Sequence, residues 1–418
     1  MRRLKDLVRQ QVLPSMCPRC RKILERKMLN LEKLRGQRRK LAPLIEQQRR
    51  DAVPLVDDLL KLPQEKQVRK IQLTRHRLRS RPVAEELLLR SRQAVHHNPY
   101  EAVRLAELAR EVALTLVGVG ELAALSGGQR GILDLMGRCL AFQANGYRVA
   151  CDFETAKHCF SRAEDHLNRG TGDQLLQAEI LSLRASLVHN QRQFHQAIDL
   201  ADRTEEIYIE LEETHLQGRL LVKKAGIYRD WGHLETAVGI LIEACKCIDE
   251  EKDPRLAAIA STNLAEYFCQ LGKPAEANVV MDDSHERFHN TVDSGSTLLL
   301  YREWTAAKVA WGLGNLEEAE DKFIAVKEAW ADLENSYNSA LVSLDLAEFY
   351  TVFDRLEDVA AIAEETAKTL EVMEMHREAL QAVYHFFFAA KRRQNAVEVI
   401  RKAAATLHRY RYCRVLPS

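Results

Sequence analysis

Apolar residues recur at helical spacing through residues 219–249, before and after a polar turn at residues 230–233. This spacing predicts two short amphipathic helices, since the apolar positions of a strand would alternate instead. Each apolar stripe contains a small residue, Ala225 in the first helix and Ala237 in the second, so the two helices can approach closely. Neither helix can bury its stripe alone, and the pair therefore needs neighbouring helices.

The same turn and the alanine that follows it recur along the chain. The residues equivalent to Ala237 are separated by steps of 41, 40, 40, 42 and 40, and they are Ala156, Ala197, Ala237, Ala277, Ala319 and Val359. A fixed period in this range predicts a solenoid or array of repeats. A degraded copy around residues 98–102 precedes the series, and a last helix pair, at about residues 379–390 and 395–409, follows it. Terminal copies are expected to be atypical because they cap the stack.

The repeat resembles the tetratricopeptide repeat (TPR). The residues that match its Ala-x3-Phe pattern and its turn are Ala156 with Phe160, Ala319 with Phe323, Gly314 with Asn315, and Gly272 with Lys273. The resemblance covers about residues 84–410 and implies an all-α solenoid of antiparallel helix pairs. HEAT and armadillo repeats are the alternative, because the period is near 40 instead of the 34 of the TPR family. Cys151 also stands where a turn glycine is usual, and the closing proline is missing.

These patterns predict four regions in the chain. Residues 1–82 form a basic helical N-terminal region, and residues 83–126 form an atypical capping helix pair. The TPR-like array occupies residues 127–410, after a break at Ser126-Gly127-Gly128, and residues 411–418 form a tail.

The net charge of +1 conceals an uneven distribution. Residues 1–81 contain 24 Lys or Arg against 8 Asp or Glu, a net charge of +16, which leaves −15 for the rest of the chain. A basic head predicts either an anionic partner or a contact between head and body. The anionic partner would be nucleic acid, an anionic membrane surface or an acidic protein groove. The alternative is a solvated helix that packs on the first repeat. The candidate contact residues are Arg35, Arg38, Arg39, Lys40, Arg75, Arg77 and Arg79.

The cysteine pattern bears on location and on metal binding. Nine cysteines without disulfide spacing favour a reducing cytosol, and the N-terminus lacks the apolar run of a signal peptide. No apolar stretch is long enough to span a membrane. Cys17 and Cys20 provide half of a zinc site, which needs four ligands, and no second pair follows nearby. The two cysteines are either ligands of a structural zinc ion, which dimerisation through the head would favour, or two free thiols. No other cofactor is expected.

Two further motifs resemble catalytic signatures. Residues 125–129, LSGGQ, match the signature loop of ABC-type ATPases, but the chain contains no phosphate-binding loop to accompany it, which excludes that activity. His285, Glu286 and His289 fit the HExxH motif of zinc hydrolases, with Glu303 as a possible third ligand. A solvated helix end explains the same residues, so hydrolysis is a remote alternative and we expect no catalysis.

The resemblance to TPR arrays implies that the first helix of each pair lines a concave face. Aligning these helices on Ala144, Ala185, Ala225, Ala265, Ala307 and Ala347 predicts the inward-facing residues. They are Arg138, Asn145, Arg148, Ser182, Ser186, His189, Arg219, Lys223, Arg229, Asn263, Glu266, Tyr301, Trp304, Lys308, Trp311, Asp345 and Glu348. The early positions are basic, which suits a carboxylate or a peptide backbone. The aromatic residues that follow either anchor a partner or pack between repeats.

Longer repeats of this kind are typical of bacterial adaptors and regulators. The sequence therefore predicts a non-catalytic cytoplasmic scaffold that binds a protein segment in the concave groove. The alternative is a regulator whose basic head binds nucleic acid while the array acts as a sensor or forms a homo-oligomer.

Overall fold

The computed structural model describes residues 46–74, 77–117, 128–285, 297–371, 377–391 and 397–409. Within these ranges the secondary structure is helical, with no strand. The chain divides into two compact units, one of residues 1–90 and 105–136, the other of residues 91–104 and 137–418. The predicted all-α solenoid of antiparallel helix pairs is confirmed.

The first unit contains a helix at residues 46–60, followed by α3 (Gln64–Leu73). It also includes the first part of α4 (Arg81–Ala94), most of α5 (Pro99–Thr115) and the start of α7 (Gly128–Val149). Val56, Ile71 and Leu87 are fully buried, so helices from separate parts of the sequence share one core. An ion pair of 2.7 Å between Arg90 and Asp57 links α4 to the first helix.

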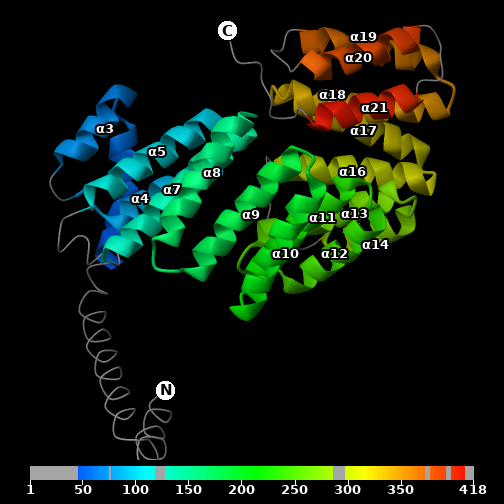
Figure 1. Ribbon diagram of the computed structural model, residues 1–418. Helices are drawn as coiled ribbons and strands as arrows, with labels where there is room; N and C mark the ends of the chain where they lie inside the picture. Colours follow the sequence, from blue (N-terminus) through cyan, green and yellow to red (C-terminus); the bar gives the residue numbers. More distant parts are fainter. Residues whose placement is uncertain are drawn as a thin grey trace, which may run out of the picture. The chain divides into compact units, whose positions relative to one another are not determined.

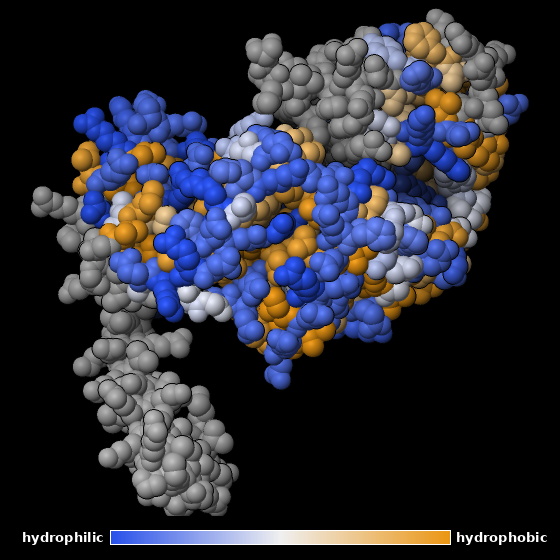
Figure 2. Space-filling view, viewed as in Figure 1, coloured by the Kyte–Doolittle hydropathy of each residue, from blue (hydrophilic) through white to orange (hydrophobic). Residues whose placement is uncertain are grey.

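The second unit contains the repeats, and from α8 onward each helix packs against the next one along the chain (Figure 1). The visible surface is mainly hydrophilic, with smaller hydrophobic areas over α10 and α12 (Figure 2). The helices are α8 (Phe153–Asn168), α9 (Gln174–Asn190), α10 (Phe194–Glu210), α11 (Thr214–Trp231), α12 (Leu234–Cys247), α13 (Pro254–Gln270), α14 (Pro274–Asp283), α16 (Thr297–Leu313), α17 (Leu316–Asp332), α18 (Ser336–Val352), α19 (Leu356–Glu371), α20 (Arg377–Lys391) and α21 (Val397–Arg409).

The alanines that define the repeat lie where the two helices of each pair meet. The six predicted small residues of the first helices, from Ala144 to Ala347, are at most 3% exposed. Their partners in the second helices, from Ala156 to Val359, are at most 1% exposed. A methyl group occupies little space, so the backbones can approach closely at these positions, and this explains why the spacing of alanines predicted the helix pairs.

The turn within each repeat has the same backbone geometry throughout the array. Its helix ends at a residue with a left-handed φ, and the next amide N–H donates to the carbonyl five residues earlier. Left-handed φ favours glycine because glycine has no Cβ. The six left-handed residues are Cys151, Arg192, Gly232, Gly272, Gly314 and Asp354. Only half of them are glycine, so the repeated geometry extends to copies that lack the sequence signature.

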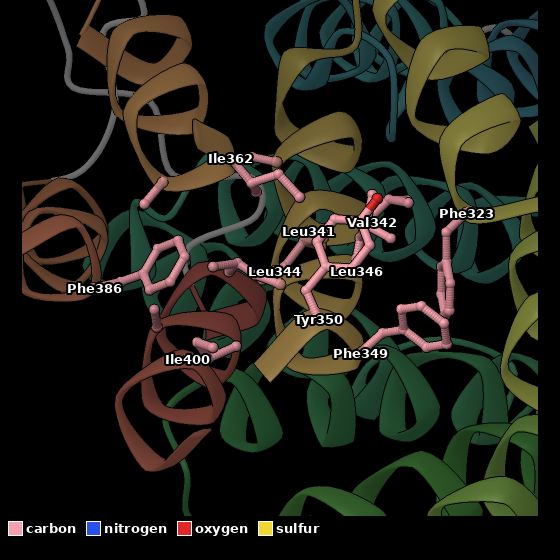
Figure 3. Packing of buried hydrophobic residues seen from close by; sticks show 14 of the residues in the cluster. Phe323, Leu341, Val342, Leu344, Leu346, Phe349, Tyr350, Ile362, Phe386 and Ile400 are labelled. Carbon is pink, nitrogen blue, oxygen red and sulfur yellow. The ribbon is translucent and has the colours of Figure 1, made fainter. Parts of the chain in front are cut away.

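The last helices depart from the regular stacking. α21 packs against α18 as well as against α20. Phe386 of α20 and Ile400 of α21 lie in one buried cluster with Leu344 of α18 (Figure 3). Arg401 of α21 forms an ion pair of 2.6 Å with Glu348 of α18, a position predicted to face a partner. The predicted last pair therefore exists, but its second helix covers part of α18.

Candidate partner-binding face

The predicted concave residues lie on α7, α9, α11, α13, α16 and α18, and we call this surface the first-helix face. Many of its polar side chains bond to the next repeat, often to the residue 41 positions further on. Such pairs are Arg138 with Glu179, Ser182 with Lys223, His189 with Asp230, and Trp304 with Asp345. The repeat period is therefore visible in the polar contacts as well as in the core.

Glu179 is the central carboxylate at the α7 end of the face. Its oxygens accept hydrogen bonds from Arg138 at 2.8 Å and from Arg92 at 2.9 Å. Both guanidinium groups also lie over the ring of Phe142, at 5.6 and 5.8 Å from its centroid. Sequence reasoning identified Arg138 but missed Arg92 and Glu179. Arg92 belongs to the degraded first copy, where the register was too weak to assign a face.

Lys223 has an unusual environment on α11. Its ammonium group donates a hydrogen bond of 2.9 Å to the Ser182 hydroxyl. The side chain still reaches solvent, but protein atoms crowd the ammonium group on this face. This desolvation, together with repulsion from Arg148, Arg92 and Arg219, lowers the pKa of Lys223 to about 8. A crevice beside it is lined by Ser182, Ala185, Ser186, His189, Ala201, Leu220, Lys223 and Ile227.

Arg219 and Arg229, also on α11, have carboxylate partners. Arg219 donates to Asp253 at 2.7 Å, and Asp253 also accepts from the Leu256 amide at the start of α13. Arg229 donates twice to Asp230, at 2.7 and 2.9 Å. The Arg219 contact therefore joins α11 to the start of α13, whereas the Arg229 contact lies within α11.

Asp230 also bonds to the preceding repeat. Its second carboxylate oxygen lies 2.9 Å from His189 Nε2. Burial alone would raise the pKa of Asp230, but the His189 hydrogen bond and the Arg229 charge outweigh it and hold the pKa well below its usual range. Asp230 therefore stays ionised and links α9 to α11.

The later part of the face is closely packed. Trp304 is 6% exposed, and its indole N–H donates to Asp345 at 2.8 Å. Lys308 lies 3.0 Å from Asp345 and 3.6 Å from Glu266. Burial alone would lower the pKa of Lys308, but these two carboxylates outweigh it and the pKa is raised.

The other two aromatic residues of this part also contact the protein itself. Tyr301 accepts a hydrogen bond of 3.0 Å from Asn338, and Trp311 packs edge-on against Phe323 and Phe349. These contacts support the interpretation that the aromatic residues pack between repeats.

Three solved structures that align with this chain are described here. The apo form of RapI aligns with 80% of this chain and 100% of its own length, at 14% identity and a TM-score of 0.52. The chain is a TPR-like repeat protein. The second structure is a STAND signal-transduction ATPase with a tetratricopeptide-repeat sensor, from Pyrococcus horikoshii. It aligns with 76% of this chain and 53% of its own length, at 14% identity and a TM-score of 0.49. NprR in complex with its cognate peptide NprX aligns with 76% of this chain and 88% of its own length, at 13% identity and a TM-score of 0.47.

The TPR-like interpretation of the repeat is therefore confirmed. No protein-family model matches the chain, and no curated protein matches it.

Of the remaining predicted residues, some contact other parts of the protein and others lie outside the described residues. Asn145 accepts from Arg148 at 3.0 Å, and Asn263 is half-buried on α13. Arg79 donates to the carbonyl of Gln72 at 2.7 Å. Outside the described residues lie Cys17, Cys20, Arg35, Arg38, Arg39, Lys40, Arg75, Glu286 and His289.

The described part of the TPR-like protein has neither a metal-binding cluster nor a membrane-spanning helix. There, no group of three or more His, Cys, Asp or Glu side chains lies close enough to hold a metal ion. His285 follows the end of α14, beyond Asp283. None of the helices in the same ranges is both long and apolar enough to cross a bilayer.

Proposed function

We propose that the TPR-like array is a non-catalytic scaffold that binds a protein segment on the first-helix face of α9, α11 and α13. The observation that carries this proposal is the open space at Gly226 of α11. A Cβ added there would meet no atom within 4 Å. Gly226 lies 40 residues after Ser186 and 40 before Glu266, so it occupies the inward position of its repeat.

The proposal places the binding surface in one part of the array. Lys223, Ser186 and Asn263 are accessible or half-buried polar residues on the first helices α11, α9 and α13. On the later helices, Lys308 of α16 pairs with Asp345 of α18, and Arg401 of α21 pairs with Glu348 of α18. A preorganised polar surface binds an extended segment without the entropic cost of ordering itself.

The test is a steric block with a matched control. A random peptide library is selected on the immobilised full chain, and the affinity of the recovered peptides is measured for two variants. Gly226→Trp fills the open space on α11, and we expect it to weaken binding by at least about tenfold. Gly239→Trp on α12 is the control, because a Cβ there also meets no atom within 4 Å and α12 is the second helix of its repeat. Equal affinities for both variants would place the binding site elsewhere.

The scaffold is further proposed to act as an adaptor or regulator in a bacterial cytoplasm. The support is the resemblance to long-period TPR proteins.

A further inference from the structure

Two adjacent lysines of α11 have opposite electrostatic environments. The ammonium group of Lys224 lies 2.6 Å from Asp202 and 2.8 Å from Glu205. Its pKa is raised, because these carboxylates outweigh the effect of burial. Lys223 instead donates to the neutral hydroxyl of Ser182, and within the described residues no carboxylate forms an ion pair with it. Among the described residues, Lys223 is therefore a cation with no carboxylate in an ion pair with it.

The charges around Lys223 are mainly positive. Arg148, Arg92 and Arg219 all disfavour its protonated form. Glu179 is the opposing charge nearby, but it already accepts hydrogen bonds from Arg92 and Arg138. An anion placed beside Lys223 would relieve this repulsion and gain a charge-assisted hydrogen bond.

The crevice next to Lys223 has donors suited to one small anion. Ser182 contributes a hydroxyl group, above an apolar floor that includes Leu220 and Ile227. Ser186 and His189 also line the crevice, but the Ser186 hydroxyl donates to the Ser182 carbonyl and His189 bonds to Asp230. The Ser182 hydroxyl accepts from Lys223, and a hydroxyl that accepts can still donate its own proton. The ammonium group has further N–H donors beyond the one directed to Ser182.

We propose that this crevice is a subsite for a single oxyanion, a carboxylate or phosphoryl group carried by the bound segment, with Lys223 as counter-ion and Ser182 as second donor. The inference rests on the proposed function, because the segment supplies the anion. It adds that the partner is acidic at one defined position.

The first test uses inorganic phosphate and acetate as probes of the full chain. Melting temperature is compared with that in chloride at equal ionic strength, for wild type and for Lys223→Met, Ser182→Ala and Lys224→Met. Binding to the native state raises the melting temperature by mass action. Phosphate also stabilises proteins through exclusion from their surface, but that effect is common to all four proteins.

We expect an additional shift in wild type that Lys224→Met retains, Ser182→Ala reduces and Lys223→Met abolishes. Lys224→Met is the matched control, since it removes the same charge one residue away. An equal shift in Lys223→Met and wild type, or no additional shift in wild type, would overturn the inference. A shift for phosphate without one for acetate would assign the subsite to phosphoryl groups.

The second test separates the inference from the proposed function. In peptides selected on the full chain, each acidic residue is changed to its amide, and a phosphoserine version is made in parallel. We expect one change to weaken binding to wild type about tenfold and to leave binding to Lys223→Met unaltered. If Gly226→Trp blocks the peptides but no such change matters, the scaffold function stands and the subsite is wrong. If no peptide binds while phosphate still requires Lys223, the subsite stands and the scaffold function is wrong.

Discussion

Lys223 on α11 and Lys308 on α16 both lie on the first-helix face, yet their surroundings differ. Lys308 has two carboxylates within 3.6 Å and a raised pKa. Lys223 has a hydroxyl at 2.9 Å, three arginines in its vicinity and a pKa lowered to about 8. A lysine on this face thus joins neighbouring repeats at α16, whereas at α11 its positive charge is the one that we propose for ligand binding.

The backbone does not explain this difference. Gly232 and Gly314 end the first helices of these two repeats with φ values of 93° and 85°. What differs is which side chains the neighbouring repeats contribute: Asp345 and Glu266 next to Lys308, but Ser182 next to Lys223. In a repeat protein, function can therefore change through one neighbouring residue while the fold stays the same.

The largest expected effect comes from making the same substitution in both regions. Lys308→Met leaves two carboxylates close together without their cation, and we expect the free energy of unfolding to fall by about 2 kcal/mol. Lys223→Met removes a repelled charge, so it should leave the free energy of unfolding unchanged or raise it. Urea unfolding measures both, and hydrogen exchange in α16 to α18 shows whether the loss is local. Equal losses would mean that the two lysines are equivalent after all.

The next effect tests whether the backbones of the two regions are alike. Gly232→Ala and Gly314→Ala each force a Cβ into left-handed backbone, at a cost of about 1 kcal/mol. Neither added Cβ meets an atom within 4 Å, so the strain is in the backbone alone. The melting temperatures of the two variants should therefore fall by similar amounts. Gly239→Ala, inside α12, is the control and should stabilise slightly through helix propensity.

The third comparison is the dependence of stability on pH, which differs between the two lysines because their pKa values shift in opposite directions. The folded pKa of Lys223 is lowered, so its unfavourable contribution is present below about pH 8 and is relieved as the pH rises towards the unfolded value of about 10.4. The folded pKa of Lys308 is raised, so its stabilisation persists through this window and is lost only at higher pH.

Unfolding between pH 8 and 10 therefore separates the two lysines. Wild type should gain stability relative to Lys223→Met, and its advantage over Lys308→Met should stay constant. The groups that set the response of Lys223 are Arg92, Arg148, Arg219 and Glu179. A constant difference between wild type and Lys223→Met across this range would contradict the comparison.

The sequence predicted the helix pairs well because close packing needs small residues at fixed positions. Ala225 and Ala237 mark that requirement within one repeat, and the same spacing identified the others. It also predicted Ser182 and Asp345 as inward-facing. It could not show that Asp345 would bond to both Trp304 and Lys308, because such pairings depend on how one repeat sits on the next.

The polar pairs that join neighbouring repeats could also be predicted from the repeat period. Adding 41 to His189 gives Asp230, and adding 41 to Arg138 gives Glu179, so the period itself could have suggested both pairs. The contact of α21 with α18 left no such mark. Arg401 and Glu348 are 53 residues apart, outside the period, and their pairing follows from the atypical packing of the last helices.

The hydrogen bonds between α9 and α11 have a mechanical consequence. Lys223 to Ser182 and His189 to Asp230 join the same two helices at separate points along their length. A ligand that changed the angle between these helices would have to stretch both contacts at once. The two helices would therefore resist this change in angle. Part of the binding energy would be stored as strain in the protein and would be recovered when the ligand dissociates.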